Sequence, residues 1–217
     1  MMRPLCWSLA FSLLALTGCH AKFKKEAPTL GAVRVQVLMT GGPEVNLGKM
    51  YNYDNDAAAL VSTVVNTVQA VKEVDQTKRI AQAVQIDKVN EAMKAGLGQT
   101  LAGGPPFAYT DQENAPALLQ LEVMSYGLSV PWLGAPGEFT YDIRARIYKA
   151  NGDRVYRARM ECTVGAGDPD AAAVVLGVVN NVKQLKEMSD AQIQETFEVT
   201  ANWCGQQWVR KMRKHAG

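Results

Sequence analysis

The residues of this chain that could do chemistry are mainly its cysteines, because histidine is scarce. The four cysteines and two histidines are Cys6, Cys19, Cys162, Cys204, His20 and His215. Two histidines near opposite ends argue against a His-based triad or a zinc site. The sequence contains no Gly-x-Ser-x-Gly, phosphate-binding loop, dinucleotide fingerprint or Cys-x-x-Cys. We therefore expect no catalytic residue, no metal site and no cofactor.

The first 18 residues have the pattern of a secretory signal peptide. Arg3 supplies a positive start, and an uninterrupted run of apolar and small residues extends from Leu5 to Leu16. A run of about a dozen such residues, followed by a small-residue cut site, is typical of an export signal and is short for a membrane span. We therefore predict that residues 1–18 are removed.

The four residues Leu16-Thr17-Gly18-Cys19 resemble the lipobox of bacterial lipoproteins. This resemblance implies that the Cys19 thiol carries diacylglycerol, that cleavage occurs before it, and that the new amino terminus can be acylated. It also implies an outer-membrane position facing the periplasm, because His20 stands where an Asp would retain the product in the inner membrane. An ordinary signal peptide with a chance cysteine is the alternative.

Residues 19–31 are expected to tether the lipidated cysteine to a single folded domain, residues 32–217. The tether carries Lys22, Lys24 and Lys25, which would either meet anionic headgroups or keep the segment solvated. Over the whole chain, 23 Lys and Arg face 21 Asp and Glu. This balance gives no reason to expect a nucleic acid partner.

Four segments alternate between apolar and polar residues with the period of a strand. They are residues 33–37, 119–123, 139–148 and 156–164. Asn151-Gly152 lies between the last two and predicts a β-hairpin. Helical spacing marks residues 57–71, a stretch from about 76 to 101 that continues or restarts at Asp87, and a last helix opened by Ser189 with capping-box spacing. This order predicts an α+β fold, an antiparallel sheet with a hairpin and with helices packed on one face.

Two cysteines are expected to meet in the layer between sheet and helices. Cys162 lies on the apolar face of its strand, and Cys204 lies on the apolar face of the last helix. Disulfides persist outside the cytoplasm, so we predict a bridge between them. Two buried free thiols are the alternative.

Four arginines share the solvent face of the predicted hairpin: Arg144, Arg146, Arg157 and Arg159. A two-residue turn at Asn151-Gly152 would place Arg146 opposite Arg157 and Arg144 opposite Arg159, an unfavourable pairing of like charges. Either an anionic partner or lipid headgroup offsets them, or neighbouring carboxylates do, namely Asp142, Glu161 and Glu122. Trp132, in the apolar loop between Tyr126 and Gly137, is another candidate partner contact unless that loop covers the core.

Residues 54–74 and 168–188 match at twelve of twenty-one positions. The match indicates an ancient duplication, a pair of like helices offered to a partner, or a chance likeness of Ala/Val-rich helices.

In element order and lipobox, the chain resembles small envelope lipoproteins that assist lipopolysaccharide assembly, curli secretion or ABC-type lipid transport. The resemblance implies a membrane-anchored, non-enzymatic protein that binds or scaffolds an envelope complex, with an envelope protein as its partner. A periplasmic carrier or sensor of an apolar ligand such as a lipid, held between the repeated helices and the sheet, is the alternative.

Overall fold

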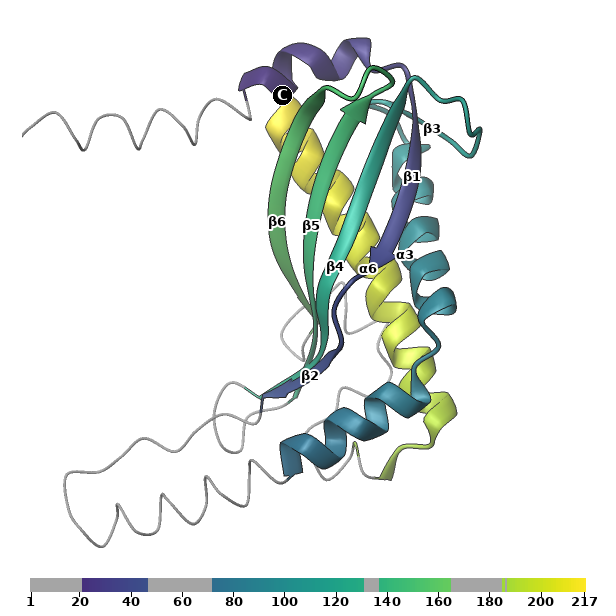
Figure 1. Cartoon of the computed structure of the whole chain (residues 1–217), viewed down its shortest axis with the longest axis vertical. Helices are drawn as coiled ribbons and strands as arrows, with labels where there is room; N and C mark the ends of the chain where they lie inside the picture. The colour runs from purple at the N-terminus through teal and green to yellow at the C-terminus, as the bar shows by residue number, and fades with distance from the viewer. Residues whose placement is uncertain (1–20, 47–71, 131–136, 165–184, 186) are drawn as a thin grey trace, which may run out of the picture.

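The computed structural model describes residues 21–46, 72–130, 137–164, 185 and 187–217. These residues form a six-stranded sheet with helices α3 (Ile86–Leu101) and α6 (Asp190–Ala216) side by side on one face (Figure 1). The α+β class and the one-sided helical layer predicted from the sequence are therefore confirmed.

The sheet is mixed. Its strands are β1 (Ala32–Met39), β2 (Pro43–Asn46), β3 (Ala108–Thr110), β4 (Ala117–Ser129), β5 (Glu138–Lys149) and β6 (Arg154–Val164). They lie in the order β3-β1-β4-β5-β6, and β2 pairs with the second half of β4. Strands β4, β5 and β6 are antiparallel as predicted, whereas β1 is parallel to β3 and β4, and β2 is parallel to β4. Alternation did not reveal these parallel pairs, because side chains have the same period in both kinds of ladder.

The predicted turn joins β5 to β6. The Lys149 amide donates to the Asp153 carbonyl at 2.9 Å, and the Gly152 amide donates to the Lys149 carbonyl at 2.9 Å. Gly152 has a φ of +84°, which a residue without a Cβ adopts at no steric cost. The predicted hairpin is therefore present, but its loop has three residues, Ala150 to Gly152, and not the two that we expected. A register shift between Ile147 and Tyr148 restores the pairing that a two-residue turn would give to the arginines.

The helices begin where local sequence signals place them. Residues 72–83 are helical, and α3 starts separately at Ile86. Of the two alternatives that the sequence left open, a continuous helix and a restart at Asp87, the structure shows a restart, one residue earlier. Helix α6 opens with the predicted capping box, in which the Gln192 amide donates to Ser189 Oγ at 3.3 Å and the Ser189 amide donates to Gln192 Oε1 at 2.8 Å. These bonds satisfy amide groups that the first turn leaves without partners.

Helices α3 and α6 contact each other backbone to backbone. A Cβ atom on Gly96 would lie 2.0 Å from the Asn202 carbonyl oxygen, and one on Gly205 would lie 2.2 Å from the Met93 carbonyl oxygen. Only glycine permits this approach, and it leaves no space for an apolar ligand between these two helices.

Residues 21–30 are folded, in contrast to the tether that we expected there. Residues 21–26 are helical, and the short helix η1 (Ala27–Thr29) continues them across one end of the sheet (Figure 1). Phe23, Ala27 and Leu30 are buried, and the Phe23 ring lies 4.4 Å from the ring of Tyr156. We did not predict this packing from the sequence, because the segment is rich in lysine and its few apolar residues lie on one narrow face.

The core lies between the sheet and the two long helices. Aromatic rings of β4, β5 and α6 pack together there, and the buried Tyr141 hydroxyl donates to the Phe197 carbonyl at 2.8 Å. None of the helices in the described part of the chain is both long enough and apolar enough to cross a bilayer.

Candidate functional site

The disulfide predicted between Cys162 and Cys204 is present. It joins β6 to α6 with Cα atoms 5.8 Å apart, across a sequence separation of 42 residues. Both residues are buried, with 4% and 0% of their surface exposed. The apolar faces of strand and helix bring the two thiols together, because each face must turn toward the same core.

The hairpin register also agrees with the sequence prediction. Arg146 lies opposite Arg157, and Arg144 lies opposite Arg159, on the sheet face away from α3 and α6. Four guanidinium groups therefore lie on one surface of two adjacent strands.

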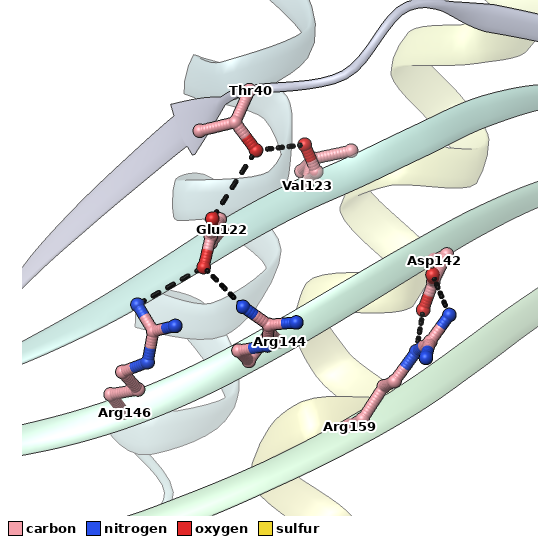
Figure 2. Close-up of polar contacts among 7 residues, drawn as sticks. All are labelled: Thr40, Glu122, Val123, Asp142, Arg144, Arg146 and Arg159. Atoms are coloured by element: carbon pink, nitrogen blue, oxygen red, sulfur yellow. Dashed lines mark hydrogen bonds and ion pairs between the residues drawn. The ribbon is translucent and has the colours of Figure 1, made fainter.

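Two carboxylates offset part of this charge, as Figure 2 shows. Glu122 on β4 forms ion pairs with Arg144 at 3.4 Å and with Arg146 at 3.0 Å, and it accepts a hydrogen bond from the Thr40 hydroxyl at 3.4 Å. Asp142 binds Arg159 through both oxygens, at 2.8 Å and 2.5 Å. These hydrogen bonds, followed by the charge of Asp142, raise the pKa of the Arg159 guanidinium. The carboxylate explanation thus accounts for three of the four arginines.

Arg157 is exposed and has no hydrogen bond or ion pair with any described residue. A further arginine, Arg34, reaches the same face from β1, where it is half-buried opposite Leu118 of β4. The sequence did not associate Arg34 with the hairpin, because β1 joins this sheet through a parallel pair distant in the chain. We call Arg34, Arg144, Arg146, Arg157 and Arg159 the arginine face.

An acidic hollow borders the arginine face. It has a volume of about 430 Å³ and is lined by Glu44, Ser125, Asp142, Arg159 and Glu161. In the described ranges, no three His, Cys, Asp or Glu side chains are arranged to hold a metal ion. The face therefore alternates positive and negative regions, an arrangement suited to recognising a charged surface.

Tyr156 and His215 form the other notable polar pair. The Tyr156 hydroxyl lies 2.8 Å from His215 Nδ1, and burial raises the pKa of Tyr156. The tyrosine is 1% exposed. This pair holds the last turn of α6 against β6.

Three sequence-derived candidates lie outside the described residues. They are Cys19, Trp132 and most of the repeated segments 54–74 and 168–188. Their predicted roles stay predictions.

Comparison with known proteins yields only distant structural likeness. No family model and no curated protein matches the chain. A hypothetical protein from Chlamydia trachomatis superposes with a TM-score of 0.33 and 8% identity, covering 75% of this chain and 97% of its own. A Caulobacter crescentus protein described as a "putative lipoprotein" superposes with a TM-score of 0.25 and 17% identity, covering 54% and 83%. Neither likeness indicates a function.

Proposed function

We propose that this chain is a non-enzymatic outer-membrane lipoprotein that faces the periplasm, is held by acyl chains on Cys19, and binds an envelope protein through its arginine face. The observation that carries the binding role is the sheet face opposite α3 and α6, which no helix in the described residues covers (Figure 1). Arg157 is exposed and unpaired among the described residues, next to three arginines held in place by Glu122 and Asp142.

The Cys162–Cys204 disulfide supports an exported location. Disulfides form and persist in oxidising compartments such as the bacterial periplasm. The bridge also fastens α6 to the hairpin that carries four of the five arginines, so it stabilises the surface that we assign to the partner.

Mass spectrometry of the native protein tests the anchor. We expect a diacylglyceryl modification on Cys19, absent from a Cys19→Ser variant, and membrane fractionation that depends on it. An unmodified residue 19 in the native protein would contradict the proposed anchor.

Site-specific photo-crosslinking in intact cells tests the partner face. A crosslinking residue at position 157 should yield a protein adduct, whereas one at Lys88, which is exposed near the start of α3, should not. Equal adduct yields from both positions, or none from position 157, would contradict the assignment of the arginine face.

A further inference from the structure

The end of the molecule nearest to Cys19 carries an excess of positive charge among the described residues. Helix 21–26 lies across this end, beside the β5–β6 turn and the last turn of α6 (Figure 1). Five exposed cations lie at this end, and Lys24 is bonded to Gly217. We call the other four the basic end: Lys22, Lys25, Arg154 and Lys214. Lys22 Nζ donates to the Arg154 carbonyl at 3.0 Å, so the helix contacts the turn directly. In the part of the chain that the structure describes, none of the four forms an ion pair.

The acidic groups near this end are fewer than its cations. Glu26 binds Lys149 at 2.5 Å, and this hydrogen bond lowers the pKa of the Glu26 carboxyl. Lys24 Nζ donates to the Gly217 oxygen at 2.7 Å, which places a cation at the carboxyl terminus. Asp153 accepts from Asn151 at 2.9 Å and is the acid of the turn. Positive charge therefore exceeds negative charge on this surface.

Chain length places this surface close to any lipid on Cys19. A residue spans at most about 3.6 Å, so the Cα atoms of Cys19 and Ala21 can lie no more than about 7 Å apart. That reach is similar to the Debye length of about 8 Å at physiological ionic strength. Lys22 follows Ala21 directly, so it would remain close to the charged headgroups.

We propose that the basic end is a docking surface for anionic phospholipid headgroups in the membrane that holds the protein. Its orientation rests on the acylation of Cys19 proposed above. The strands extend between this end and the opposite end of the molecule (Figure 1). Docking would therefore set the sheet roughly perpendicular to the membrane, with the arginine face accessible to partners beside it. The folded segment 21–30 would connect the lipidated residue directly to the domain, in place of a flexible tether.

Lysine footprinting of the acylated full-length mature protein tests the orientation. The protein is reconstituted into vesicles of phosphatidylcholine, with or without one-third phosphatidylglycerol, and treated with an acetylating reagent. We expect acetylation of Lys22, Lys25 and Lys214 to slow roughly tenfold with phosphatidylglycerol, and the difference to disappear in high salt. Lys72, Lys78 and Lys88 are exposed controls in helices toward the other end. Equal rates in both vesicles at the basic end would overturn the proposal.

Co-sedimentation of the unacylated mature chain, carrying Cys19→Ser, separates docking from anchoring. We expect binding to phosphatidylglycerol vesicles that is roughly tenfold weaker in the K22E/K25E/K214E variant and unchanged in K72E/K78E/K88E. Absence of binding, or equal losses in both variants, would overturn the proposal. Displacement by free glycerol phosphate would also overturn it, because the ligand would then be a soluble anion.

The two proposals can fail separately. If Cys19 is unmodified in cells but the Cys19→Ser chain still binds anionic vesicles through the basic end, the anchor is wrong and the lipid surface stands. If Cys19 is acylated but the basic end is not protected, the anchor stands and the docking surface is wrong.

Discussion

Glu122 is the residue on which the arginine face depends. Its carboxylate contacts Arg144 and Arg146, each of which faces another arginine across the β5–β6 ladder. The side chain is 20% exposed, so solvent screens these ion pairs only in part. Glu122 thus supplies counter-charge to one member of each like-charged cross-strand pair, and Asp142 adds a second counter-charge at Arg159.

Replacing Glu122 with Gln should lower the free energy of unfolding by about 1 kcal/mol, because two guanidinium groups lose their counter-charge. The loss should shrink in high salt. Urea unfolding at low and high salt measures it. Glu138→Gln is the matched control, since Glu138 has the same charge on the outer face of β5 but forms no ion pair among the described residues. Equal effects of the two substitutions would contradict the role of Glu122.

The lowered pKa of Glu26 predicts a pH dependence of stability. Its hydrogen bond to Lys149 is the largest cause, and the usual pKa is 4.5. Because the unfolded state binds the proton more readily, the stabilisation should be present above pH 4.5 and be lost as the pH falls through the lowered folded-state value. Urea midpoints measured from neutral to acidic pH should decline less steeply for Glu26→Gln than for the unmodified sequence.

Reduction of the Cys162–Cys204 disulfide should lower the free energy of unfolding by a large amount. Closing a loop with a sequence separation of 42 residues should contribute about 4 kcal/mol in the chain-entropy model. We expect urea unfolding with reductant, or of a Cys162→Ala/Cys204→Ala variant, to show a lower midpoint by a corresponding amount. A midpoint that does not respond to either change would show that the folded state stores compensating strain.

At the scale of elements, the contact between α3 and α6 depends on glycine. A methyl group at Gly96 would overlap the Asn202 carbonyl, whereas one at Gly98 would meet only the Tyr109 ring at 3.5 Å. Gly96 and Gly98 lie in the same helix two residues apart. Replacing each with Ala therefore separates the effect of helix–helix packing from the effect of intrinsic helix propensity.

Gly96→Ala should destabilise the protein by about 1–3 kcal/mol, because the helices must separate. Gly98→Ala should be neutral or stabilise it by up to about 1 kcal/mol, since alanine loses less entropy in a helix. Thermal and urea unfolding of both variants measure the difference. A stabilising Gly96→Ala would contradict the close contact.

At the scale of the whole molecule, residues 21–30 close one end of the sheet. Phe23 is fully buried against Tyr156, which in turn contacts His215 at the end of α6. One aromatic side chain thus connects the N-terminal segment, the hairpin and the last helix.

Phe23→Ala should lower the free energy of unfolding by about 3–5 kcal/mol and increase amide hydrogen exchange in residues 21–30. Lys25→Ala, in the same helix but exposed, should change stability by no more than about 0.5 kcal/mol. Slow exchange retained in the Phe23→Ala variant would show that other contacts hold the segment.

The sequence alone determined the features that depend on local period and turn chemistry. Strand alternation, the Asn151-Gly152 hairpin signal and the Ser189 cap depend on nearby residues. They indicated the faces of Cys162 and Cys204 and the pairing of the arginines, although not the three-residue loop and the register shift through which that pairing is reached. Three features were seen only in the tertiary structure. Strand β1 pairs in parallel, Arg34 therefore lies on the arginine face, and residues 21–30 fold against Tyr156. Each of these three features depends on contacts between residues far apart in the chain. The periodicity of a segment shows which of its faces is apolar, but not which distant segment that face will pack against.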